Sequence, residues 1–162
     1  MHEGSRADYF LNSGELLFSS EECTVRTILG SCVGVALHDP HLRVGGLCHY
    51  LLPTSPDEPS STRYGDVALP YLISRLRKAG SDPKNLRAWI VGGALLLDAH
   101  EIFFVGDRNA DYAETYLRTH NIRVVANETR GYLGRKLVFH TWNGHLHVET
   151  IPANSTRNML II

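Results

Sequence analysis

The sequence is poor in several features that mark whole classes of protein. Lys and Arg do not outnumber Asp and Glu (16 against 17, formal net charge −1), and they form no basic stripe that would neutralise a run of phosphates. No apolar run approaches the roughly 20 residues of a membrane-spanning helix. The N-terminal residues also lack the basic start and apolar stretch of a signal peptide. We therefore expect no nucleic-acid partner, no membrane insertion and a cytoplasmic location.

Cysteine is scarce as well, with three residues, Cys23, Cys32 and Cys48. An odd number cannot pair completely within one chain, and these positions lack the CxxC spacing of common structural zinc sites. We expect free thiols in a reducing compartment and no metal site.

The overall composition is that of a soluble globular domain, with 43% hydrophobic and 20% charged residues. No internal repeat or low-complexity tract divides the chain, so residues 1–162 are predicted to form one domain.

Apolar alternation and turn signals predict strands at both ends of the chain, with two helices in its middle part. The helices are expected at 66–79 and 109–120, with Asn109 able to cap the second one. Asn143-Gly144 is typical of a two-residue hairpin turn between the last two strands. The predicted strands are 24–29, 33–38, 44–50, 87–91, 122–127, 137–142 and 145–151.

Cys32 has the setting of a catalytic nucleophile. It follows Gly30 and Ser31, where a strand should turn sharply, and His49 lies on a later strand that can pair beside it. An imidazole within reach converts the thiol to the thiolate that attacks a carbonyl carbon, and then protonates the leaving group. Backbone amides at Ser31 and Cys32, in the turn after Gly30, are candidate donors to the oxyanion. The alternative is that Cys32 is an inert buried filler.

A third group often orients a catalytic imidazole, and the hydroxyl of Thr27 is a candidate for that role. An ordinary strand threonine is the competing interpretation. Cys23 and Cys48 lack a preceding Gly-Ser turn and are read as structural. Strand alternation places Leu47 and His49 on one face and Cys48 on the other, so Cys48 and His49 should not share a metal.

Several strings of the sequence resemble the CheD-type chemoreceptor glutamine deamidase family. They are TILGSCVGVALHDP (27–40), VGGLCHYLLP (44–53), RYGDVAL (63–69), WIVGGA (89–94), GDRNADYAETYL (106–117) and GYLGRKLVFHTWNGHLHV (131–148). The resemblance assigns the nucleophile to Cys32 and the catalytic histidine to His49. The family's third catalytic position, a threonine, falls on Arg26 here, so Thr27 is carried as a substitute.

The resemblance implies an enzyme that converts selected glutamines of bacterial chemotaxis receptors to glutamate and releases ammonia, without a cofactor. Hydrolysis of receptor glutamyl methyl esters is implied for some members. The implied fold is α/β, a layered sandwich of mixed, largely antiparallel β-sheets with about two helices packed on one side, as in deamidating toxins. The implied partners are the receptor's cytoplasmic domain and a CheC-type phosphatase.

Two other functions compete with the deamidase hypothesis. One is a non-catalytic adaptor that binds a CheC-type phosphatase or a receptor, and Arg26 is the residue that favours it. The other is a cysteine peptidase or acyl hydrolase, because the dyad does not distinguish an amide side chain from a peptide bond. In the apolar segment 101–107, Phe103 and Phe104 are candidate partner contacts, with a core strand as the alternative.

Overall fold

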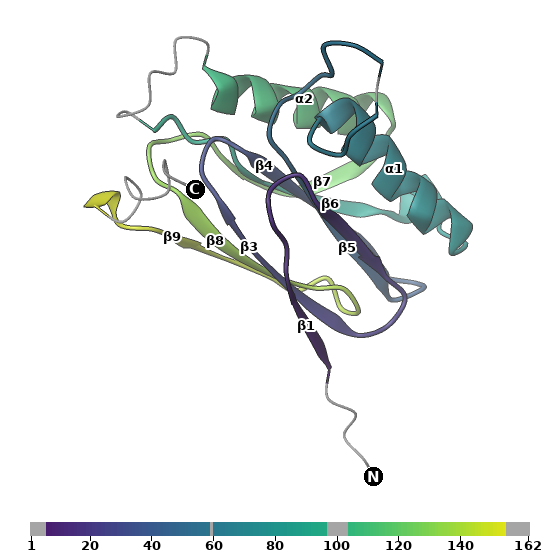
Figure 1. The fold of residues 1–162 in the computed structure, drawn as a ribbon. Coiled ribbons are helices and arrows are strands. Elements are labelled where there is room, and N and C mark those ends of the chain that lie inside the picture. The colour runs from purple at the N-terminus through teal and green to yellow at the C-terminus, as the bar shows by residue number, and fades with distance from the viewer. Residues whose placement is uncertain (1–5, 59, 97–103, 155–162) are drawn as a thin grey trace.

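The computed structural model describes residues 6–58, 60–96 and 104–154, which form two β-sheets and a layer of two α-helices (Figure 1). The first sheet has the strand order β1-β3-β8-β9 and the second the order β2-β5-β4-β6-β7. The strands are β1 (Ala7–Phe10), β2 (Leu16–Ser19), β3 (Cys23–Leu29), β4 (Val33–Asp39), β5 (Val44–Tyr50), β6 (Arg87–Gly92), β7 (Arg123–Thr129), β8 (Arg135–His140) and β9 (Leu146–Thr150). The helices are α1 (Gly65–Lys78), α2 (Val105–Thr119) and the 3-10 turn η1 (Pro83–Asn85).

Most of the strand pairs are antiparallel. The exceptions are β1 with β3 and β6 with β7, which run parallel. Both α-helices pack on the five-stranded sheet, α1 mainly against β5 and α2 against β6 and β7. The expected α/β sandwich of mixed, largely antiparallel sheets, with helices on one side, is confirmed.

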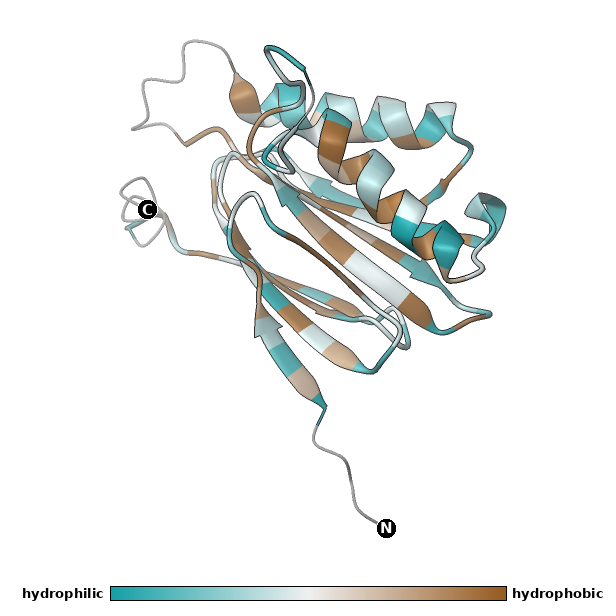
Figure 2. Cartoon of the chain, turned by 45° about the vertical axis from the view of Figure 1, so that its right-hand side comes forward, coloured by the Kyte–Doolittle hydropathy of each residue, from teal (hydrophilic) through white to brown (hydrophobic). Residues whose placement is uncertain are grey.

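The middle strands of the five-stranded sheet are buried on both faces because they lie between the helices and the other sheet. Every residue of β4 and β5 is buried. Their side chains alternate between two apolar cores, so Val35 and Cys48 face the helices while Ala36 and Leu47 face the other sheet. Figure 2 shows the apolar residues along the strands beneath the helices. Side chains of both sheets therefore meet in the inter-sheet layer.

Two strands of the structure were absent from the sequence prediction. The residues of β1 are all exposed and those of β2 are all half-buried, so neither strand has the apolar alternation that marks a half-buried strand. β1 and β2 lie at the edges of the two sheets, and the short segment between them crosses from one sheet to the other.

The prediction that Asn109 caps the second helix is wrong. The helix begins at Val105 with Phe104 at the N-cap, and Asn109 lies inside it with a fully buried side chain. Because the Asn109 amide binds backbone carbonyls of other segments, it is unavailable as a cap.

The two-residue hairpin at Asn143-Gly144 is also wrong. β8 ends at His140, and the His140 amide donates to the carbonyl of His145 across a wider connection. Thr141 does not pair with β9. Its amide donates to the carbonyl of Cys23, and its hydroxyl accepts from the Cys23 amide.

Candidate active site

Cys32 and His49 lie on the same side of the five-stranded sheet, the side that faces the other sheet. Gly34 of β4 is directly opposite His49 of β5, and Cys32 precedes Gly34 by one side-chain period. Cys32 itself lies just outside the ladder, one residue before β4 begins. Cys32 packs against the inter-sheet core and is half-buried. The space over Gly34 is taken by the side chain of Leu29, which a Cβ at position 34 would crowd.

Thr27 reaches His49 from the opposite sheet. Its hydroxyl oxygen lies 2.8 Å from Nδ1 of His49 and 2.8 Å from the backbone carbonyl oxygen of Leu11. Thr27 and His49 are 1% and 4% exposed, so both contacts are shielded from water. Of the two threonines near Arg26, Thr27 has its side chain on the inner face of β3.

The contact with Leu11 determines the tautomer of His49. A carbonyl oxygen only accepts hydrogen bonds, so the single hydroxyl proton of Thr27 is donated to Leu11. The same hydroxyl must then accept from His49, which requires the imidazole proton to be on Nδ1. The lone pair is consequently on Nε2, the nitrogen that remains for a thiol.

Burial lowers the pKa of His49 to about 4, while the nearby carboxylate of Glu15 acts in the opposite direction. The imidazole is therefore neutral at pH 7 and able to accept a proton. Its backbone is held on both sides, because the His49 amide donates to the Glu15 carbonyl and the His49 carbonyl accepts from Gly14.

The turn before Cys32 has its three carbonyl groups fixed by other segments. The carbonyl of Gly30 accepts from the amide of Ala94, that of Ser31 from the side chain of Asn109, and that of Cys32 from the amide of Gly93. In a trans peptide the next N–H points opposite to the carbonyl. The amides of Ser31 and Cys32 are thereby directed away from Ala94 and Asn109, respectively.

The last residue of β6 must be glycine for this strand to approach the turn so closely. Gly92 has φ +109°, and a Cβ at this position would overlap the carbonyl oxygen of Cys32. The absence of a side chain at Gly92 lets the end of β6 pack directly against the turn that carries Cys32.

A pocket of about 310 Å³ opens beside Cys32. It is lined by Ser31, Cys32, Leu51, Leu52, Arg63, Tyr64 and Val105. This volume is at the small end of ligand pockets and suits a single side chain better than a large cofactor. Among the described residues, no group of three His, Cys, Asp or Glu side chains would hold a metal ion.

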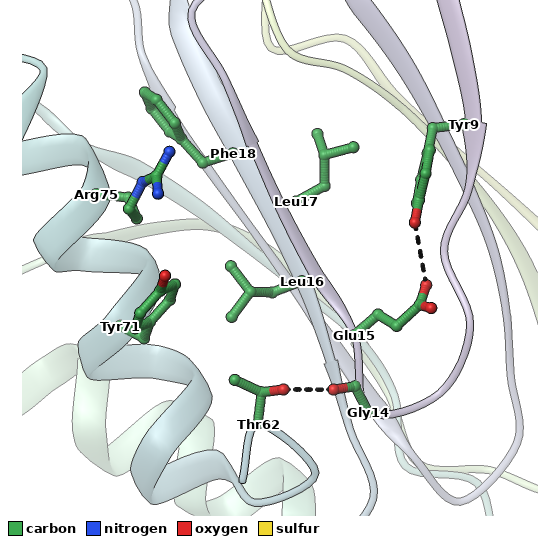
Figure 3. A pocket seen from close by; sticks show the side chains of 9 residues that line it. All are labelled: Tyr9, Gly14, Glu15, Leu16, Leu17, Phe18, Thr62, Tyr71 and Arg75. Atoms are coloured by element: carbon green, nitrogen blue, oxygen red, sulfur yellow. Dashed lines mark hydrogen bonds between the residues drawn. The ribbon is translucent and has the colours of Figure 1, made fainter. Parts of the chain in front are cut away.

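A larger pocket of about 600 Å³ lies between β2 and α1 (Figure 3). Tyr71 and Arg75 of α1 face Leu16 and Phe18 across it, and Arg75 lies over the Phe18 ring. Cys32 and His49 are not among the described residues that line it. The smaller pocket is the candidate site because Cys32 borders it.

Of the two candidate partner contacts, Phe104 is described and Phe103 lies outside the described residues. Phe104 is 55% exposed at the N-cap of α2, with a left-handed backbone. The alternative of a core strand is wrong for Phe104 and for the helical residues after it.

The arrangement of a half-buried thiol, a neutral imidazole and an orienting hydroxyl suits a cysteine hydrolase. Comparisons with known proteins show the family to which the chain belongs. The family model described as CheD chemotactic sensory transduction matches residues 51–150. The chain is 39% identical over 149 residues to a protein of Anaeromyxobacter dehalogenans named probable chemoreceptor glutamine deamidase CheD 1, covering 91% of this chain and 87% of that protein. The chain belongs to the CheD family.

Two further relatives have related names. Probable chemoreceptor glutamine deamidases of Burkholderia thailandensis and Burkholderia orbicola are 37% and 36% identical over 85% of this chain. The chain spans only 61% and 58% of these two proteins. Glutamine deamidases are hydrolases of amide carbon–nitrogen bonds, so the expected enzyme class is confirmed at the level of the family.

Among solved structures, the chain is similar to the Neisseria meningitidis protein NMB0706 of the DUF152 family. The TM-score is 0.42 at 10% identity, over 78% of this chain and 64% of that chain. In the described part of this chain, neither helix has the length and apolar character needed to cross a membrane.

Sequence reasoning missed two contributors to this site, the carbonyl of Leu11 and the side chain of Asn109. A backbone carbonyl leaves no signal in the sequence. Asn109 had one, because a polar residue among the apolar positions of a buried helix face needs a partner.

Proposed function

We propose that this chain deamidates glutamine side chains of chemotaxis receptors, with Cys32 as nucleophile and His49 as general base and acid. The observation that carries the proposal is the hydrogen-bond chain from Leu11 through Thr27 to Nδ1 of His49. It leaves Nε2 unprotonated, as a base acting on a thiol requires.

In the first half-reaction, Nε2 of His49 takes the thiol proton as the Cys32 sulfur attacks the carboxamide carbon. A carbon–sulfur bond forms and the carbonyl electrons move to oxygen. The tetrahedral intermediate collapses, the carbon–nitrogen bond breaks, and His49 returns the proton so that ammonia leaves. The product is a thioester of Cys32 with the former glutamine side chain.

In the second half-reaction, His49 takes a proton from water as the water oxygen attacks the thioester carbon. The carbon–sulfur bond then breaks, the glutamate carboxyl group is released, and the thiol is restored. A glutamyl methyl ester follows the same two steps with methanol as the leaving group.

The turn amides of Ser31 and Cys32 are proposed to stabilise the oxyanion. The fixed carbonyls of Gly30 and Ser31 support this role, because they set the directions of the two N–H groups before substrate arrives. Donors held rigidly in this way need no reorganisation during the reaction.

The substrate assignment comes from the family. The relatives' names specify chemoreceptors, whose cytoplasmic domains would be modified by a cytoplasmic enzyme. A small pocket beside an accessible thiol supports insertion of one glutamine side chain from a protein surface. The exposed ring of Phe104 supports a protein contact near the pocket, with the receptor or with a CheC-type phosphatase.

The test is ammonia release from a receptor cytoplasmic fragment, combined with its mass analysis. Native protein should add roughly one dalton per glutamine converted, and Cys32→Ala and His49→Ala should abolish the change. Cys23→Ala is the matched control, because Cys23 is a buried cysteine at the other end of β3.

The competing functions predict different results. An adaptor would bind the fragment, or a CheC-type phosphatase, without changing the fragment's mass. A peptidase would shorten the fragment. Either result would overturn the deamidase assignment.

A further inference from the structure

Asn109 contacts both backbone segments that carry the proposed catalytic groups. Its Nδ2 donates to the carbonyl of Ser31 at 3.0 Å and to the carbonyl of Leu51 at 2.8 Å. Ser31 directly precedes Cys32, and Leu51 follows His49 by two residues. The side chain of Asn109 is fully buried, on the face of α2 that also buries Ala110 and Ala113.

The orientation of the Asn109 amide is determined by its partners. Both neighbours are carbonyl oxygens, which only accept, so the NH₂ group and not the oxygen must face them. The Asn109 backbone is held as well, since the buried hydroxyl of Tyr50 donates to its carbonyl oxygen. An amide with two fixed donors on a rigid helix is a geometric constraint on both segments.

The hydrogen bonds of Asn109 hold the chain where the hydrogen bonds between β4 and β5 have ended. The pairing of β4 with β5 ends at Val33 opposite Tyr50, so Ser31 and Leu51 lie beyond the last paired residues. Antiparallel strands diverge once ladder hydrogen bonds cease. At this point the side chain of Asn109 connects the two strand ends, in place of hydrogen bonds between the strands.

We propose that Asn109 is a positioning residue that sets the separation and orientation of Cys32 and His49. It acts through the Ser31 and Leu51 carbonyls and touches neither the substrate nor the reacting atoms. The Ser31 contact also fixes the peptide plane whose N–H belongs to Cys32, so the proposed oxyanion donor depends on the same residue. The inference rests on the proposed function of the Cys32 and His49 pair.

The experiment compares native protein with Asn109→Ala and Tyr50→Phe. Two rates are measured, the alkylation of Cys32 by iodoacetamide at pH 7, located by peptide mass analysis, and deamidation of the receptor fragment. In Asn109→Ala both the alkylation rate and kcat should fall on the order of 10- to 100-fold, with KM nearly unchanged, because misplaced reacting groups slow chemistry more than binding. Tyr50→Phe keeps the amide and should show a smaller loss in the same direction.

Asn127→Ala is the matched control. The Asn127 side chain also ties α2 to a strand, through Glu114, but contacts neither catalytic segment. It should leave the Cys32 alkylation rate and kcat at native values. Thermal unfolding of each variant separates a loss of folded protein from a loss of reactivity.

Unchanged alkylation and kcat in folded Asn109→Ala would overturn the proposal, as would a loss that matches the unfolded fraction. If Asn109→Ala does not fold, Tyr50→Phe becomes the test of the proposal. A Cys32 alkylation rate at the native value in Tyr50→Phe would then overturn the positioning role. Failure of the native protein to deamidate the fragment would refute the proposed function alone, since the alkylation comparison needs no substrate.

Discussion

Replacing Thr27 by Val tests the central contact of the site. The change keeps the branched shape but removes the hydroxyl, so Nδ1–H of His49 loses its acceptor and the Leu11 carbonyl loses its donor. A buried polar group left without a partner costs about 1 to 3 kcal/mol. Since 1.4 kcal/mol corresponds to about tenfold in rate, we expect kcat for receptor-fragment deamidation to fall roughly 10- to 100-fold.

The same loss should lower the free energy of unfolding by about 1 to 3 kcal/mol, because the Leu11 carbonyl is left inside the protein. Steady-state ammonia release measures kcat, and thermal unfolding measures stability. Nitrogen NMR of labelled histidine reports the tautomer directly, with the proton on Nδ1 in native protein and redistributed toward Nε2 in Thr27→Val.

Two further variants make this prediction decisive. Thr27→Ser restores a hydroxyl and should recover most of the activity. Thr24→Val removes a half-buried hydroxyl from the opposite face of β3 and should leave kcat unchanged. A folded Thr27→Val protein with kcat within about twofold of native would refute the orienting role.

Three other predictions follow from the surroundings of the site. Arg26→Thr should leave the rate of ammonia release unchanged and alter the free energy of unfolding by less than about 1 kcal/mol, because Arg26 is exposed and pairs with the exposed carboxylate of Asp8. A large loss of ammonia release would instead show that position 26 matters to catalysis. The acid limb of the kcat/KM profile should lie near pH 4, because burial lowers the pKa of His49 to about 4. The lowered pKa also makes stability depend on pH. The stabilisation from keeping His49 neutral is complete above the unfolded-state histidine pKa of about 6.5, and it is lost as the pH falls toward 4. Denaturant titrations at several pH values would measure this loss. Iodoacetamide should label Cys32 in native protein well before Cys48, since burial raises the pKa of the Cys48 thiol to about 12; equal labelling rates by peptide mass analysis would contradict the assignment of the reactive thiol.

The parts of the fold that the sequence predicted are those with strong periodicity or a clear stop signal. β5 spans the predicted 44–50, and α1 differs from its prediction by one residue at each end. The missed strands β1 and β2 are short edge strands without apolar alternation, so their structure depends on the partners β3 and β5 and not on local pattern. Their ranges required tertiary information.

The residues of the candidate site also differ in how far the sequence alone could predict their roles. Cys32 and His49 could be proposed from the sequence because it shows both the turn before the thiol and the strand that carries the imidazole. Thr27 was left between two interpretations, because its role depends on a contact between sheets. Asn109 was given the wrong role, because asparagine near a helix start more often caps that helix than reaches a distant strand.

The segment that crosses between the sheets explains why the missed N-terminal strands matter to the chemistry. β1 pairs with β3 and β2 with β5, so the residues between them must pass the inter-sheet layer next to His49. There the Leu11 carbonyl accepts a hydrogen bond from the Thr27 hydroxyl, while the backbone of Gly14 and Glu15 binds the backbone of His49. The family-model match begins at residue 51 and leaves this segment out. Segments inside and outside the matched range nevertheless contribute to one candidate site. The turn of Cys32 is bound by residues of β6 and α2, which lie inside the range, and the backbone of His49 is bound by the N-terminal segment, which lies outside it.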